Sequence, residues 1–395
     1  MSLTNENFNY RIKEFPRSVS ILGWGLLALG IILIVVSFFI DRTRSSFNIL
    51  ISFMFLMSIG LGSLFLVALE YVAGAVWSTP IRRVSEFLST ILFIIPVLAV
   101  PLYFSMHEVF HWSHSELLRQ DAVLAGKSPY LNVPFFIIRT LVCFAIWLLF
   151  YILIVRNSEK QDELKSQAIT TRNIRSSAVF MPVFAITITL AAIDWMMSLE
   201  PHWFSTIFGV YYFAGTILAA LASATIAVVL FIRKGYFTNI TEDHLYSLGA
   251  LLFAFVNFWA YIAFSQYLLI WYANLPEETT WFLLRWQGSW KIVSIALIVI
   301  HFIVPYFGLL SQPSKMNPRR LMFMSVWILF AHLFDLYWLI MPTFSRTGVT
   351  LGWMEFAFPI AAVGLVIVFF TLKAKNTNII PIGDPKLQRG LDFRL

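Results

Sequence analysis

The feature that most constrains the fold of this chain is a series of ten apolar stretches. Each is long enough to cross a hydrocarbon core of about 30 Å as a helix. Of the 395 residues, 59% are hydrophobic and only 12% are charged, and a soluble domain cannot cover so much apolar surface. We therefore predict an all-α integral membrane protein with ten transmembrane helices. They span residues 18–40, 47–73, 84–106, 134–155, 178–199, 204–232, 246–273, 289–310, 320–341 and 351–373.

The lysines and arginines are divided unequally between the two sides of the membrane. Of the 28, 20 fall on the side that carries both termini and 6 on the other, while Arg139 and Lys291 lie inside predicted helices. The positive-inside rule therefore places both termini in the cytoplasm. The net charge of +7 is spread over short loops, which excludes a nucleic-acid partner. The N-terminus is polar, so no removable signal peptide is expected.

The predicted helices form a repeat. Helices 2–5 and helices 6–9 each make a set of four that starts on the outer side, which predicts two parallel-repeated four-helix bundles. They cover 47–199 and 204–341, with helices 1 and 10 at the periphery of a membrane domain over 18–373. The remaining residues form short cytoplasmic segments, 1–17 and 374–395.

Each half carries an aspartate inside an apolar helix. Asp194 and Asp335 both stand seven residues before a proline, and a basic residue, Arg139 or Lys291, begins the preceding helix. Carboxylates at membrane depth usually face a partner charge or a proton path. We predict an Asp194–Arg139 pair and an Asp335–Lys291 pair at matching depth. Two interpretations remain open, namely static ion pairs that hold helices together or acids that handle protons.

Two histidines lie near the second aspartate. His301 is in helix 8, and His332 precedes Asp335 by three residues, so His332 and Asp335 share a helix face. A hydrogen-bonded relay is the favoured interpretation. The alternative of a b-type haem between the two histidines depends on a single pair, and a di-metal centre would need Glu-x-x-His motifs that are missing.

Two further acids lie near helix ends. Glu70, at the cytoplasmic end of helix 2, can pair with Arg82 or Arg83 or can begin a proton path, and Glu355 lies at the outer start of helix 10. The candidate proton path therefore comprises Asp194, Asp335, His332, His301, Glu70 and Glu355.

A histidine cluster follows helix 3. His107, His111 and His114 stand beside Glu108, in a spacing that can resemble a zinc site. The favoured alternative is an amphipathic segment that lies at the interface, as Phe110 and Trp112 suggest, or contacts a partner, so no metal is predicted. The single Cys143 excludes a disulfide framework, a cysteine-ligated cluster and a covalent c-type haem. We expect no catalytic residue, no covalent cofactor, and no haem or iron–sulfur ligands in this chain.

Three stretches resemble a known family. They are DWMMSLEPHWFSTIFGVYYFAG (194–215), ALEYVAGAVWSTPIRRVSE (68–86) and IGDPKLQRGLDF (382–393). They are similar to the ActF-type integral membrane subunit of alternative complex III, a quinol:cytochrome c oxidoreductase, within the NrfD/PsrC-like family. The resemblance covers most of the chain.

The resemblance implies ten helices with two four-helix bundles in a bacterial cytoplasmic (inner) membrane. It implies a subunit without redox centres that scaffolds a respiratory electron-transport complex, with possible binding of menaquinone or ubiquinone and possible proton conduction. The implied partners are a multihaem cytochrome c, an iron–sulfur subunit, a mono-haem cytochrome c, a paralogous NrfD-like membrane subunit, lipids and a terminal oxidase. The candidate quinone-binding residues are His107, Arg139, Asp194 and His202. A stand-alone ion or solute transporter and a purely structural anchor are the alternatives.

Overall fold

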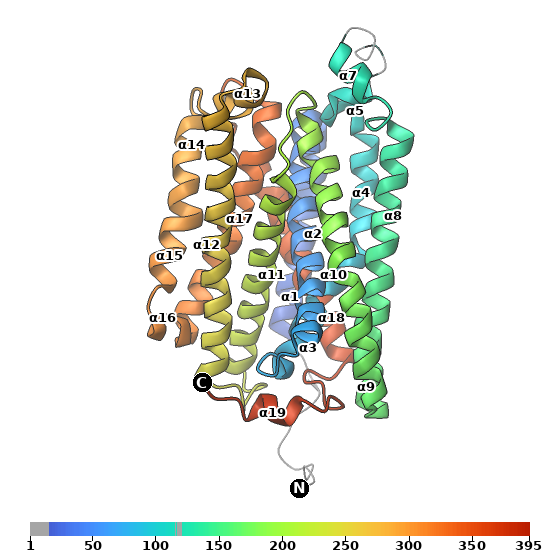
Figure 1. The fold of residues 1–395 in the computed structure, drawn as a ribbon, viewed down its shortest axis with the longest axis vertical. Helices are drawn as coiled ribbons and strands as arrows, with labels where there is room; N and C mark the ends of the chain where they lie inside the picture. Colours follow the sequence, from blue (N-terminus) through green and yellow to red (C-terminus); the bar gives the residue numbers. More distant parts are fainter. Residues whose placement is uncertain (1–15, 115, 117–120) are drawn as a thin grey trace.

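The computed structural model describes residues 16–114, 116 and 121–395. The predicted N-terminal segment, 1–17, therefore lies almost entirely outside the described residues. The described part is 82% helical, has no strands, and contains ten helices long and apolar enough to cross a membrane. The predicted all-α, ten-helix class is confirmed. Figure 1 shows α5, α7 and α13 at one end of the molecule and α9, α16 and α19 at the other, which we call the far end and the tail end.

Several membrane crossings consist of more than one helical piece. The crossings, in chain order, are α1 (Arg17–Ile40); α2 (Arg42–Ala73); η1 (Thr79–Ile81) with α3 (Arg82–Leu88), η2 (Ser89–Phe93) and α4 (Ile95–Phe104); α8 (Val133–Tyr151) with the π-helix η4 (Ile152–Arg156) and α9 (Asn157–Leu164); α10 (Gln167–Trp195) with η5 (Met197–Leu199); α11 (Phe208–Arg233); α12 (Glu242–Ala273); α14 (Trp290–Leu297) with the π-helix η6 (Ile298–Ile303) and α15 (Val304–Leu309); α17 (Pro318–Phe344); and α18 (Met354–Asn376). Short connecting helices are α5 (Met106–Val109), η3 (His111–Ser113), α7 (Ala122–Lys127), α13 (Pro276–Arg285), α16 (Gln312–Met316) and α19 (Leu387–Leu391).

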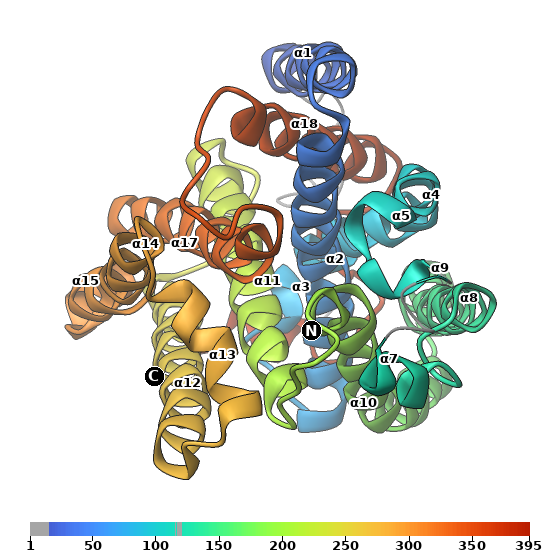
Figure 2. The ribbon, with the colours of Figure 1, turned by 90° about the horizontal axis from the view of Figure 1, so that it is seen from above.

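The crossings form two groups of four with α2 and α11 at the centre. Viewed from above, α2, α4, α8 and α10 lie on one side, α11, α12, α14 and α17 on the other, and α1 and α18 outside both (Figure 2). The most apolar window of α2 is 94% buried, whereas that of α1 is only 17% buried. The hydrophobic faces of α2 therefore pack on protein, and those of α1 face lipid.

Small residues allow the closest helix contacts. A Cβ added to Gly62 of α2 would lie 2.6 Å from the carbonyl oxygen of Thr216 in α11. A Cβ on Gly30 of α1 would lie 2.5 Å from the backbone nitrogen of Ala361 in α18. Glycine at these positions brings the backbones into contact, as is usual where membrane helices cross.

The C-terminal segment folds back across the tail end. Nε2 of His244 is hydrogen-bonded at 2.8 Å to the carbonyl of Gly390. A Cβ on Gly390 would lie 2.7 Å from the carbonyl oxygen of Val76, and a Cβ on Gly383 would overlap the backbone oxygen of Gln161. The two glycines of the IGDPKLQRGLDF stretch are therefore needed because the segment lies directly on the backbone of the membrane domain.

Candidate functional site

Three ionisable side chains meet in the second bundle. His301 comes from η6, and His332 and Asp335 come from α17. Their ligand-type atoms all lie within 4.8 Å of one another, and each residue is 1% exposed. The sequence placed His332 and Asp335 on one face but did not show that His301 joins them.

Neutral donors, rather than a cation, surround the carboxylate of Asp335. The hydroxyl of Tyr211 donates to Oδ1 at 2.5 Å, and Nε1 of Trp259 donates to Oδ2 at 3.2 Å. Neither aromatic residue was identified from the sequence, since only packing brings α11 and α12 onto this face of α17. Within the described part of the chain, Asp335 forms no ion pair.

Both histidines keep unused nitrogens. The ring of His301 stacks on Trp259 with centroids 3.7 Å apart, and neither of its ring nitrogens has a hydrogen-bond partner. Nε2 of His332 is hydrogen-bonded to Oγ of Ser58 at 3.0 Å, whereas its Nδ1 has no partner. Buried polar atoms are normally satisfied by protein, water or an ion, so three free nitrogens beside a carboxylate mark a site for a small polar species.

The donor set limits what that species can be. Two imidazoles and one carboxylate can hold a small cation such as Zn²⁺, and they can equally hold a water molecule with two to four polar partners. Both oxygens of Asp335 already accept one hydrogen bond, and each keeps a further lone pair for the bound species. A b-type haem fits less well, because Nε2 of His332 is already hydrogen-bonded to Ser58 and the backbone of Gly215 lies beside the Cε1–Nδ1 edge of its ring.

The predicted Asp335–Lys291 pair is wrong. Lys291 is exposed, and its ammonium lies 5.3 Å from the ring centroid of Trp286. Trp290, Val293 and Leu297 form the buried face of α14, so the helical period turns Lys291 away from the bundle. Asp194 lies in the last turn of α10, and Asp335 lies nine residues before the end of α17.

Arg285 is the buried cation that the sequence analysis missed. Its guanidinium lies 3.5 Å from the ring centroid of Trp281 and donates to the carbonyls of Trp338 and Leu339 at 3.2 and 2.7 Å. The carbonyl of Trp338 is free because Pro342, four residues later, has no N–H. Burial lowers the pKa of Arg285 to about 9, and the group stays protonated at neutral pH.

The predicted Asp194–Arg139 pair of the first bundle is confirmed. Nε and Nη2 of Arg139 each donate to the carboxylate at 2.9 Å, and Nη1 donates to the carbonyl of Tyr130 at 2.8 Å. The rings of Tyr130 and Phe135 lie 3.8 and 4.4 Å from the guanidinium. Burial, followed by the charge of Asp194, raises the pKa of Tyr130 to about 12. In this bidentate pair both charged groups are hydrogen-bonded to each other, whereas the histidines beside Asp335 keep nitrogens without a partner.

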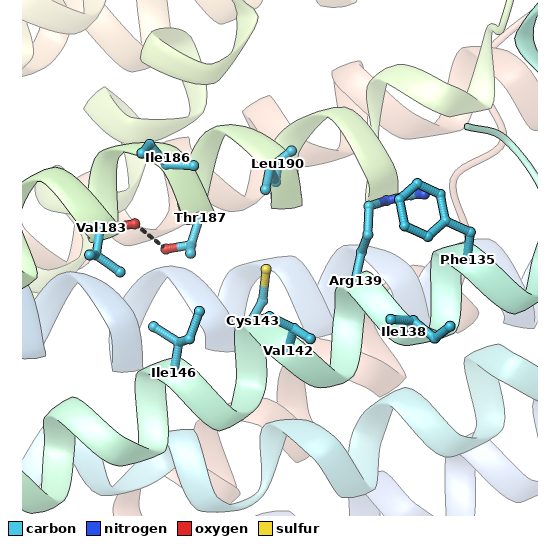
Figure 3. Close-up of a pocket in the computed structure, with 10 residues that line it drawn as sticks. All are labelled: Phe135, Ile138, Arg139, Val142, Cys143, Ile146, Val183, Ile186, Thr187 and Leu190. Atoms are coloured by element: carbon cyan, nitrogen blue, oxygen red, sulfur yellow. Dashed lines mark hydrogen bonds between the residues drawn. The ribbon is translucent and has the colours of Figure 1, made fainter. Parts of the chain in front are cut away.

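A groove of about 370 Å³ runs beside this pair, between α8 and α10. Figure 3 shows Arg139 and Phe135 at one end of the groove and Ile146 and Val183 at the other. The lining is almost entirely apolar. Such a lining suits an apolar chain better than a polar head group.

The four candidate quinone-binding residues are not joined by hydrogen bonds into one cluster in the described part of the chain. Arg139 and Asp194 bind each other, while Nε2 of exposed His202 contacts the carboxylate of Asp121 at 2.5 Å. Nδ1 of His107 is hydrogen-bonded to Ser113 at 2.9 Å. Among the described residues, no hydrogen bond or ion pair joins either histidine to the Arg139–Asp194 pair.

The zinc-like histidine array is not assembled in the described residues. The rings of His107 and His114 lie 5.1 Å apart, and Nε2 of His114 is hydrogen-bonded to the carbonyl of His107. The interfacial interpretation is also wrong for Phe110 and Trp112, which are 0% and 1% exposed and contact Phe136. Both aromatic side chains belong to the core of the first bundle.

The two remaining acids of the candidate path are paired. Oε1 and Oε2 of Glu355 accept from Arg44 at 2.8 and 2.6 Å, and Asn48 donates to Oε1 at 3.1 Å. This pair joins α2 to α18 at the far end. Glu70 binds Arg82 at 2.9 Å, so the predicted pairing with the Arg82–Arg83 run is confirmed.

The established class follows from these features: the chain is a multi-pass α-helical membrane protein. Comparison with protein-family models and with curated proteins gives no match. Any narrower assignment depends on the sequence resemblance and on the geometry above.

Gly215→Ala should disturb the cluster directly. A Cβ there would lie 2.7 Å from Cε1 of His332, so the ring must shift. Overpacking of this kind lowers the free energy of unfolding by about 1–3 kcal/mol, measurable by denaturant unfolding in detergent. Gly25→Ala, where nothing lies within 4 Å, is the matched control and should not destabilise. Equal stability of the two variants would contradict the tight contact.

Proposed function

We propose that this chain is a membrane subunit, without redox centres, of a quinol-oxidising respiratory complex of the alternative complex III type. In this proposal the second bundle moves protons and the first bundle supports the assembly. The sequence resemblance motivates the type of complex. The observation that carries the proton role is the convergence of His301, His332 and Asp335, with three unpaired nitrogens, inside a buried bundle.

The chemistry of the cluster suits proton transfer. A neutral imidazole accepts a proton at one nitrogen and releases one from the other. His301 and His332 supply such nitrogens next to the carboxylate of Asp335, and the hydroxyl of Tyr211 adjoins that carboxylate. Quinol oxidation releases protons, so positioned acids and bases are useful to the assembly.

The remaining elements fit the same proposal. Arg139 uses its donors on Asp194 and Tyr130, and the adjoining groove would hold the apolar chain of a quinol or a lipid. The basic tail end would face the bacterial cytoplasm. Electrons would pass through a multihaem cytochrome c, an iron–sulfur subunit and a mono-haem cytochrome c, with a paralogous membrane subunit alongside and a terminal oxidase as acceptor.

Purification through a tag on this chain tests the assignment. We expect haem c and iron–sulfur subunits to co-purify from native membranes, together with quinol:cytochrome c reductase activity. The isolated chain in proteoliposomes should transport no ions or solutes. Purification without redox subunits, combined with flux through the isolated chain, would instead support a stand-alone transporter.

A further inference from the structure

A buried ionic network lies at the tail end, away from the histidine cluster. Its arginines, Arg82 and Arg83, come from α3 and are 1% and 0% exposed at their side chains. Four carboxylates contact them, and none has a side chain more than 6% exposed. The acids are Glu70 of α2, Glu86 of α3, Asp162 of α9 and Asp384 of the C-terminal segment.

The network contains two more acids than bases. Asp162 binds Nη2 of Arg83 at 2.8 Å and also accepts from Asn378 and from the backbone of Gly383 at 2.9 and 3.2 Å. Glu86 bridges the two arginines and accepts from Ser158 at 2.7 Å. These two carboxylates are therefore well supplied with donors.

Glu70 and Asp384 share one nitrogen of Arg82. Each also has one further donor, because Thr79 donates to Oε1 of Glu70 at 3.1 Å and the backbone of Lys386 donates to Oδ1 of Asp384 at 2.8 Å. Oε1 of Glu70 and Oδ2 of Asp384 contact the same Nη1 of Arg82, at 2.9 and 2.8 Å. The two oxygens thus lie within roughly 6 Å of each other, a distance at which two carboxylates disfavour simultaneous ionisation. One guanidinium nitrogen neutralises one of them, and the other retains uncompensated charge if ionised.

A buried polar atom without a partner also lies beside Arg82. The hydroxyl of Tyr71, on a residue 2% exposed, has no hydrogen-bond partner, and its ring lies 4.7 Å from the guanidinium of Arg82. The other titratable and charged groups around the pair are Arg83, Glu86, Asp162, the Glu159–Lys373 ion pair, and Lys386, whose ammonium lies near Gly74.

We propose that Glu70 and Asp384 hold one proton between them, making this network a proton-binding site completed by the C-terminal segment. Loss of that proton places a second negative charge beside Nη1 of Arg82, which favours its return. The pair takes up the proton from the tail end, and it either releases the proton to that end or passes it into the bundle. The shared proton between Glu70 and Asp384 does not depend on the proposed function. Only its role in loading a proton path depends on that proposal.

Infrared difference spectroscopy of the purified complex at neutral pH tests the shared proton. The wild type should show the carbonyl band of a protonated carboxylic acid that both Glu70→Gln and Asp384→Asn remove, because the remaining acid is then ionised against Arg82. Asp392→Asn, on an exposed acid of the same segment that binds Gln388, should leave the band unchanged. A band that survives in both variants, or no such band in the wild type, would overturn the proposal.

Two further measurements keep the test unambiguous. Asp384→Asn could detach the C-terminal segment and so remove the band for a different reason. Glu70→Gln retains the contact of Asp384 with Arg82, so this variant tests the shared proton with the segment still in place. Proton uptake by complex in proteoliposomes should slow at least tenfold in both variants if the site loads the path. Loss of the band with unchanged uptake would support the shared proton and count against the proposed proton path.

Discussion

Asp335→Asn is expected to lower the rate of proton movement by the reconstituted complex on the order of 100-fold, the effect of losing one positioned acid or base. Asparagine keeps the shape of the side chain and can still accept from Tyr211 or Trp259, and no cation is left unpaired. The free energy of unfolding should therefore change by about 1 kcal/mol or less. Proton movement during quinol turnover, measured with a pH-sensitive dye, gives the rate.

Subunit content on a native gel serves as the control for assembly of this variant. Tyr211→Phe, which removes the 2.5 Å hydrogen bond but keeps the acid, should give an intermediate rate. Normal proton movement in Asp335→Asn with an intact complex would refute the role of the cluster.

Asp194→Asn should show the opposite pattern, with a large loss of stability. The substitution leaves the guanidinium of Arg139, 8% exposed, without its bidentate partner. Breaking a buried ion pair from one side costs about 3–5 kcal/mol, and the lower end is expected because Tyr130 and Phe135 still contact the guanidinium. Thermal or denaturant unfolding of the chain in detergent measures this effect.

The double variant Arg139→Met/Asp194→Leu provides the matched comparison. Removal of both charges leaves no unpaired ion, and apolar replacement of a buried pair is often neutral or stabilising. The double variant should therefore recover most of the stability that Asp194→Asn loses. Equal instability of the single and double variants would show that the pair contributes more than mutual neutralisation.

The ten crossings could be predicted because apolar length is a local property of sequence. The predicted ends were less accurate where polar residues continue a helix beyond its apolar part. The fourth crossing extends through Asn157–Leu164, and α10 begins at Gln167 rather than near residue 178. Hydropathy detects the apolar part of a helix, while backbone hydrogen bonding continues past it.

Ionic partners were predictable where the sequence brought them to the same end of adjacent helices, as for Arg139 and Asp194. The partners of Asp335 were not, because three packed helices determine them. Arg285 and Lys291 stand only six residues apart, yet Arg285 is buried against α17 and Lys291 is exposed. Spacing alone does not reveal which of two nearby cations turns inward.

The placement of Asp384 beside Arg82 has a consequence for how the protein is made. Roughly 300 residues separate the two in the order of translation, so at about 5–20 residues per second Arg82 leaves the ribosome some 15–60 s earlier. During that interval the arginine has Glu70 and Glu86 nearby but not its contact with Asp384. A nascent chain thus lacks this contact until the segment around Asp384 has been synthesised.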